Sequence, residues 1–158
     1  MINSNDCAEA AEYLSSLFEL KDKDENSGTS EFYYHQEGLL AAAIVAYSRA
    51  FMDSRGKQFA APKVKVNLGE IFGHNINKIK LHKLILEKRH KVVAHSEWDY
   101  RNSTLIEVTN SRSTLRKNSV VNYQQGIDLE LFKEVIETMK LHFRKETFNK
   151  DVASVKAK

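Results

Sequence analysis

Apolar residues recur at three- and four-residue spacing through four stretches of this 158-residue chain, and few residues interrupt them. Such spacing gathers apolar side chains on one face of a helix. The chain has only six glycines and one proline, the residues that most often end a helix. We therefore predict a mainly α protein that folds as a small helical bundle.

The pattern also sets the expected bounds of the elements. A polar, glycine-containing segment, 21–30, is expected to be a loop. The four main helices are expected over 5–20, over 31–52, from between 67 and 77 to about 93, and from Asp128 to about 149. Asp128 is of a residue type that often caps the start of a helix.

Between the third and fourth helices the apolar period changes from helical to alternating. "STLIEVTN" and "TLRKNSVVNY" are rich in β-branched residues and are separated by a turn-like "SRS". This pattern predicts a small β-hairpin at about 103–123, which needs the helices for support because two strands alone are marginally stable. With no repeat and no linker, 1–150 are expected to form a single domain and 151–158 a frayed tail.

The ends and the apolar runs of the chain bear on its location. The opening "MINSNDCAEA" is polar, and the longest apolar run, Leu39 to Tyr47, is about half of what a membrane span needs. The lone cysteine, Cys7, lies near an N-terminus expected to be flexible, and it can build neither a disulfide framework nor a zinc site. We expect a cytoplasmic protein that does not contact a membrane.

A cationic run covers the expected third helix, from His74 to Lys91. It contains a single carboxylate, Glu87, and its lysines and arginines are Lys78, Lys80, Lys83, Lys88, Arg89 and Lys91. Histidines 74, 82 and 90 add charge that depends on pH, but their spacing of eight residues suits no metal, so neither a metal site nor a cofactor is predicted. Such a run either attracts phosphates or is an ordinary solvated helix face.

The run ends in "EKRHKVVAHSEWD", Glu87 to Asp99, which contains candidates for metal-free RNA cleavage. An arginine supplies a planar fork of donors for phosphate oxygens, and a histidine exchanges a proton near neutral pH. On an ideal helix Arg89 and His95 are about 120° apart, so they meet only if the helix loosens near Ala94 or if two subunits come together. The alternatives are a surface cation at Arg89 and, at His95, a histidine that faces the helix dipole.

"RHKVVAHSE" resembles the signature of the HEPN superfamily, in which a polar residue follows an arginine and a histidine lies four to six residues beyond it. "AYSRAFMDSRGK", Ala46 to Lys57, is similar to the branch of this family associated with abortive infection. The resemblance implies a four- to five-helix bundle of HEPN type that forms a homodimer, in which arginine and histidine from both subunits share a cleft. It also implies metal-independent ribonuclease activity, often in toxin–antitoxin or phage-defence systems.

Carried over by position, the resemblance makes three residues catalytic. Arg89 would stabilise the scissile phosphate, His95 would transfer a proton, and His90 would orient or assist. Further candidates for contact with substrate are Lys88, Lys91, Arg49 and Trp98. For Arg49 the alternative is to hold the following loop, and for Trp98 it is to pack under the hairpin.

The leading hypothesis is therefore a dimeric, metal-independent endoribonuclease, a toxin or phage-defence effector, with RNA and an antitoxin protein as partners. The alternative is a non-catalytic module of the same fold that binds RNA, a nucleotide or a protein partner. A third possibility is a helical structural protein that dimerises and binds no nucleic acid. The first two hypotheses are separated by changing His95: if the protein is a nuclease, the change abolishes cleavage and leaves RNA binding intact.

Overall fold

The computed structural model describes residues 2–27, 32–51, 66–89, 105–106, 115–116, 124 and 126–156. In chain order these residues form the helices α1 (Ile2–Ser27), α2 (Tyr33–Arg49), α3 (Leu68–Ile71) and α4 (Ile76–Lys88), the strands β1 (Leu105–Ile106) and β2 (Leu115–Arg116), and the helix α5 (Leu129–Lys156). The predicted mainly α class is confirmed.

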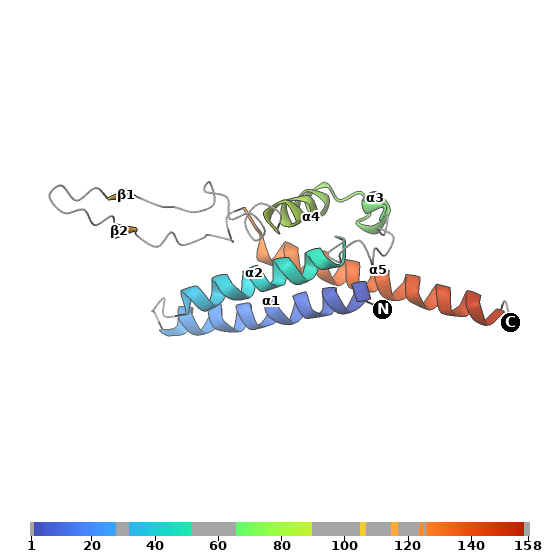
Figure 1. Cartoon of the computed structure of the whole chain (residues 1–158), viewed down its shortest axis with the longest axis horizontal. Helices are drawn as coiled ribbons and strands as arrows, with labels where there is room; N and C mark the ends of the chain where they lie inside the picture. The colour runs from blue at the N-terminus through green and yellow to red at the C-terminus, as the bar shows by residue number, and fades with distance from the viewer. Residues whose placement is uncertain are drawn as a thin grey trace.

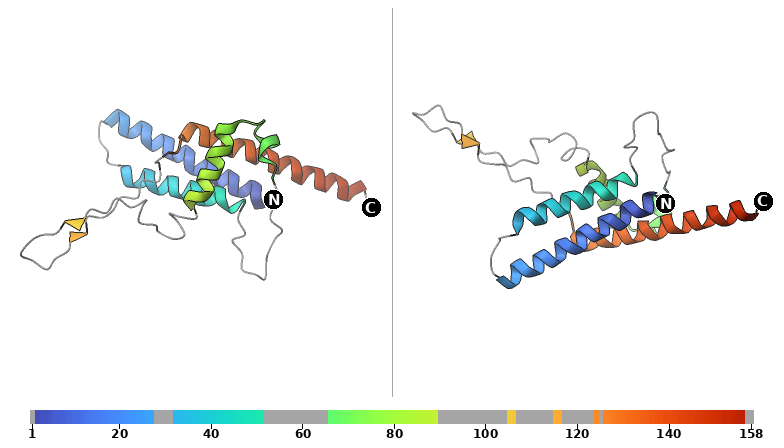
Figure 2. Two further views of the ribbon diagram at one scale, coloured as in Figure 1. Left: turned by 90° about the horizontal axis from the view of Figure 1, so that it is seen from above. Right: turned by 60° about the horizontal axis from the view of Figure 1, so that its bottom comes forward.

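The long helices lie along one another and α4 crosses them. Helices α1 and α2 are antiparallel neighbours, and α5 packs along the other side of α1 (Figure 1). Helix α4 lies across α2 and α5 on the face away from α1, with the short α3 beside it (Figure 2). The C-terminal part of α5 extends beyond the start of α1.

The core fills the space between these helices, and α5 supplies its predicted apolar face in full. The buried residues of that face are Phe132, Val135, Ile136, Met139 and Phe143. The ring of Phe132 lies 5.5 Å from that of Tyr47, and the ring of Phe143 lies 5.7 Å from that of Phe51. Burial of a side chain of this size stabilises the fold by roughly 1.5–3 kcal/mol, so the aromatic contacts hold α2 and α5 together.

Helix α1 is longer than the sequence pattern indicated. The prediction of a loop over 21–30 is wrong up to Ser27, because α1 continues that far. Lysine and glutamate favour helix, and the carboxylate of Asp24 at this end accepts hydrogen bonds from the backbone of Phe32 and the side chain of Gln36. The start of α2 is therefore tied to the end of α1.

Cys7 also differs from expectation. We placed it near a flexible N-terminus, but it lies in α1 and is fully buried among the core residues. Burial is the main reason why the pKa of its thiol rises to about 12. Cys7 is thus a small apolar core residue and not a reactive thiol.

The predicted third helix is two helices. The backbone turns at Gly73 (φ 56°) and His74 (φ 60°), and the His74 N–H donates to the Gly69 carbonyl at 2.7 Å. This hydrogen bond closes α3 with a left-handed cap that suits glycine. The chain then starts α4 anew, with the side chain of Asn75 accepting hydrogen bonds from the backbone of Asn77 and Lys78.

Helix α5 begins as predicted, because Asp128 accepts a hydrogen bond from the Leu131 N–H at 3.0 Å. The helix continues to Lys156, so most of the segment expected to be a frayed tail is helical. Within the predicted hairpin, the four described residues pair antiparallel, with Leu105 opposite Arg116 and Ile106 opposite Leu115. The rest of that prediction lies outside the described residues. None of the described helices is both long and apolar enough to cross a membrane.

Candidate functional site

Arg89 lies at the C-terminal end of α4, directly after its last residue. Its backbone is still helical (φ −56°, ψ −46°), and its N–H donates to the carbonyls of Ile85 and Leu86. The side chain is half-buried. The other candidates of the motif, His90, Lys91, His95 and Trp98, lie outside the described residues, so their convergence with Arg89 stays a prediction.

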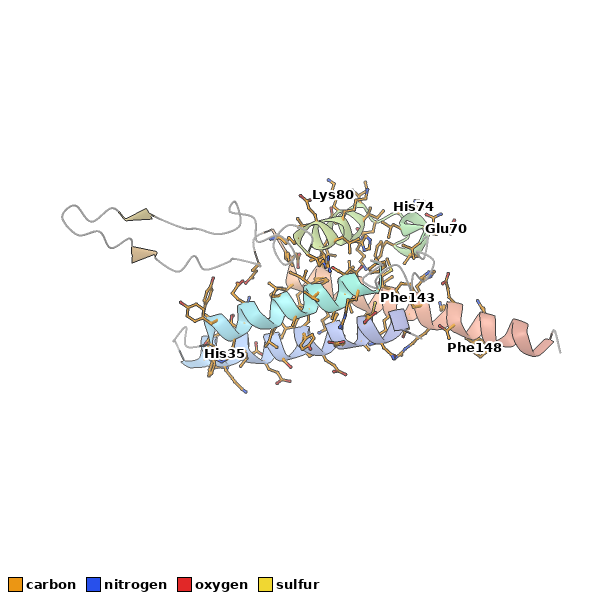
Figure 3. The ribbon with its side chains drawn as sticks, in the orientation of Figure 1. His35, Glu70, His74, Lys80, Phe143 and Phe148 are labelled. Carbon is orange, nitrogen blue, oxygen red and sulfur yellow. The ribbon has the colours of Figure 1, made fainter. Side chains whose placement is uncertain are left out.

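Helix α4 has two faces of different chemistry. The buried residues on its inner face are Leu81, His82, Ile85 and Lys88. The exposed residues of the helix are Ile76, Asn77, Lys80, Lys83 and Glu87. Figure 3 shows Lys80 on the side of α4 that points away from the other helices. On an ideal helix Lys80 and Arg89 are about 180° apart, so these two cations do not belong to one surface.

The cationic run is therefore divided by the fold. Lys78 forms an ion pair with Glu134 of α5, with 2.9 Å between Nζ and Oε2. Lys88 is turned into the protein, whereas Lys80 and Lys83 face solvent. Among the described residues of the run, a continuous basic stripe is absent.

His82 is a core residue and not part of a basic surface. It is 3% exposed, its Nδ1 lies 2.7 Å from the hydroxyl of Tyr47, and its ring is 4.8 Å from that of Phe51. Burial, with a smaller effect of the Lys83 charge, lowers its pKa to about 4. His82 is therefore neutral near pH 7, which corrects the expectation that it adds charge to the run.

Lys88 is the other polar residue on the inner face. Its side chain is 1% exposed, which disfavours direct contact with a substrate, so the predicted contact stays a prediction. Burial lowers the pKa of its ammonium group, and the carboxylates of Glu37 on α2 and Glu87 oppose that shift. The sequence could have indicated the burial of both residues. His82 and Lys88 each lie three positions from Ile85, so they share its face of the helix.

Arg49, a predicted substrate contact, has carboxylate partners within the bundle. Its Nε lies 3.3 Å from Asp6, and its terminal nitrogen donates to Glu9, both on α1. The hydroxyl of Tyr13 also donates to Glu9, at 3.1 Å. Arg49 thus fastens the end of α2 to the start of α1, and its charge is largely balanced there.

Two further histidines belong to the surface. His35 is exposed on the first turn of α2, and His74 is exposed beside Glu70 at the turn between α3 and α4 (Figure 3). In the part of the chain that the structure describes, no three histidine, cysteine, aspartate or glutamate side chains lie close enough together to hold a metal ion.

An open groove of about 430 Å³ lies between α4 and the start of α5. Its lining residues are Asn77, Lys80, Leu81, Leu84, Gly126, Asp128 and Leu131. Three of the lining residues are leucines, and the charged ones are Lys80 and Asp128. The groove lies on the same side of α4 as Lys80 and thus away from Arg89.

Comparisons with protein-family models, with curated proteins and with solved structures find no match for this chain.

Proposed function

We propose that this protein is a metal-independent endoribonuclease of HEPN type that acts as a homodimer, in the role of a toxin or phage-defence effector. The observation that carries the proposal is the position of Arg89, the arginine of "RHKVVAHSE", at the half-buried end of α4 in a helical bundle. A permanent cation at a partly desolvated helix end is suited to stabilise charge that develops on a phosphate.

The proposed reaction is a transesterification within the RNA. His95 accepts the proton of a ribose 2′-hydroxyl, whose oxygen bonds to the neighbouring phosphorus. The bond from phosphorus to the 5′ oxygen breaks, and a protonated imidazole, the role proposed for His90, returns a proton to that oxygen. Arg89 stabilises the extra negative charge on the phosphate. The products are a 2′,3′-cyclic phosphate and a 5′-hydroxyl, and no metal takes part.

The test is cleavage of a labelled single-stranded RNA in EDTA by the wild type, Arg89→Ala and His95→Ala. Matched controls are Arg144→Ala and His35→Ala, which remove an exposed arginine and an exposed histidine elsewhere. Loss of the Arg89 cation is expected to lower kcat by about 10²–10³. Equal cleavage by all five proteins would mean that the nuclease is a contaminant, and loss of activity in EDTA would contradict the metal-independent mechanism.

A second candidate, a non-catalytic module that binds RNA, is favoured by one observation. Lys80 and Lys83 are exposed on the outer face of α4, remote from Arg89. If this face binds RNA, the Lys80→Ala/Lys83→Ala double variant should bind more weakly, and its slope of log K against log salt should be shallower by about 2. Cleavage by the wild type with unchanged binding by this double variant would exclude the second candidate.

A further inference from the structure

Two large apolar side chains on α5 face solvent. Leu141 is 54% exposed and Phe148 is 68% exposed. They are seven positions apart, so they lie on one face of the helix, roughly 10 Å apart along its axis. Figure 3 shows Phe148 on the part of α5 that extends beyond the start of α1. Single exposed apolar residues are ordinary, so the charges around these two decide what the face can bind.

The charges on this face are separated along the helix. Three carboxylates precede Leu141 and two cations follow it, and on an ideal helix all five lie within about 60° of Leu141. The carboxylates, which we call the acidic half, are Glu130, Glu134 and Glu137; the cations, which we call the basic half, are Arg144 and Lys145. All five are exposed or half-buried. We call these five residues, together with Leu141 and Phe148, the solvent face of α5.

The solvent face of α5 lies between α1 and α4. On one side, Nζ of Lys133 lies 5.4 Å from the centre of the Phe18 ring of α1. On the other side, Lys78 of α4 forms its ion pair with Glu134, while Glu137 pairs with a lysine of α5 itself. The side chains of Glu134 and Glu137 remain 60% and 45% exposed, and each carboxylate can accept further hydrogen bonds.

The order of these charges fits a second copy of the chain. If the second α5 runs antiparallel to the first, its basic half lies opposite the acidic half of the first, and the apolar residues of the two helices meet near Leu141. A two-fold axis makes each contact twice. A parallel arrangement places carboxylate against carboxylate and cation against cation, which is unfavourable. One helix thus carries both the charges that its own solvent face attracts, in the order that an antiparallel pair requires.

We propose that the solvent face of α5 binds a second copy of this chain, with the two helices antiparallel and a two-fold axis near Leu141. The proposal does not rest on the proposed function, because Arg89 lies at the other end of α4 from Lys78, which pairs with this face. A single helix pair is small beside the roughly 1,600 Å² of a standard interface, so the association is expected to be weak and to weaken further with salt.

The experiment measures the mass of the full-length protein by sedimentation over a range of protein concentrations. The acidic variant, Arg144→Glu/Lys145→Glu, and the basic variant, Glu134→Lys/Glu137→Lys, each place like charges opposite one another in the antiparallel pair. Each variant alone should therefore associate at least about 10-fold more weakly than the wild type. An equimolar mixture of the two should associate again, because the changed residues of one variant then face those of the other.

Two further proteins complete the set. Lys80→Glu/Lys83→Glu reverses two exposed cations on α4 and is the matched control, which should associate like the wild type. Leu141→Ser/Phe148→Ser removes the apolar contact, and it should also weaken the association by at least about 10-fold. Thermal unfolding followed by circular dichroism checks that each protein is folded.

The proposal is overturned if the mass of the wild type does not rise with concentration, if it rises equally in both charge variants, or if their mixture stays dissociated. If the basic variant does not fold without the ion pairs of Glu134 and Glu137, the acidic variant and Leu141→Ser/Phe148→Ser decide: association as in the wild type refutes the proposal, and weaker association in folded protein supports it. If two copies also pair through another surface, the variants fall to half the wild-type mass instead of to the monomer, which again supports the proposal. Cleavage of RNA tests the proposed function alone.

Discussion

The middle and the end of α4 bury polar residues in opposite ways. In the middle, His82 loses its charge: it is neutral at pH 7 and shares a hydrogen bond with Tyr47. At the end, Lys88 is buried with Glu37 and Glu87 acting on its ammonium. A hydrogen bond between neutral groups tolerates small shifts of the two helices, whereas a buried charge requires its partner. The two buried polar residues are therefore expected to respond differently when a neighbouring polar group is removed.

The largest effect is expected when the carboxylate of Glu37, which opposes the lowering of the Lys88 pKa, is removed. Glu37→Leu alone leaves the Lys88 ammonium buried with less compensation, and it should lower the free energy of unfolding by about 3 kcal/mol. Urea unfolding at pH 7 measures the loss. The matched variant Glu134→Leu, which removes the partner of the more exposed Lys78, should cost less than about 1 kcal/mol. Equal losses of stability in Glu37→Leu and Glu134→Leu would mean that the two ends of α4 do not differ in this respect.

The neutral histidine predicts a pH dependence. Unfolded chains bind a proton at His82 near pH 6.5, whereas the folded protein binds it only near pH 4. Since the unfolded state binds more protons between these values, stability falls as the pH is lowered from 6.5 to 4, by about 3 kcal/mol for this group. Urea midpoints at pH 7 and pH 4.5 should differ less in His82→Leu than in the wild type, while His35→Gln, at an exposed site, should resemble the wild type. If the two urea midpoints differ as much in His82→Leu as in the wild type, a group other than His82 causes the pH dependence.

Removing the hydroxyl of Tyr47 tests the hydrogen bond in the middle of α4. Tyr47→Phe keeps the ring that packs on Phe132 and leaves Nδ1 of His82 without this partner. The expected loss in the free energy of unfolding is about 1–2 kcal/mol, smaller than that of Glu37→Leu. A loss greater than that of Glu37→Leu would mean that stability depends more on the hydrogen bond of His82 than on the charge that acts on Lys88.

The smallest effect is expected on the outer face. Lys83→Ala should change the free energy of unfolding by less than about 0.5 kcal/mol, because the side chain is exposed. It should still raise the pKa of His82 slightly, since the Lys83 charge contributes to lowering that pKa. NMR titration of the His82 ring measures the shift, with Lys80→Ala as a control that leaves it unchanged. If the pKa of His82 is unchanged in Lys83→Ala, burial alone lowers that pKa.

Some of the fold was predictable because it depends on local periodicity. The inner face of α5 and the cap at Asp128 follow from spacing and residue type alone. The break between α3 and α4 was missed, although Gly73 lies at the position where a left-handed cap ends α3. The extension of α1 to Ser27 was missed because its polar residues are held as helix partly by contacts with the start of α2.

The candidate site was predictable only as a motif. Sequence placed Arg89 at the end of a cationic helix, and that position is found. It also assigned Lys88 to substrate and His82 to a basic surface, and both are buried. Counting charges along a segment does not reveal which of them the neighbouring helices cover.

By itself, the sequence determined the helical class, the capped start of α5 and the location of Arg89 at a helix end, because periodicity and caps act within a few residues. Only the tertiary structure decided which cations reach solvent and which lie against α2, and it divided one basic run into an outer face with Lys80 and Lys83 and an inner face with Lys88. The physical reason is that burial depends on which helix lies opposite, and the charge of Glu37 that compensates Lys88 comes from a helix distant in the chain.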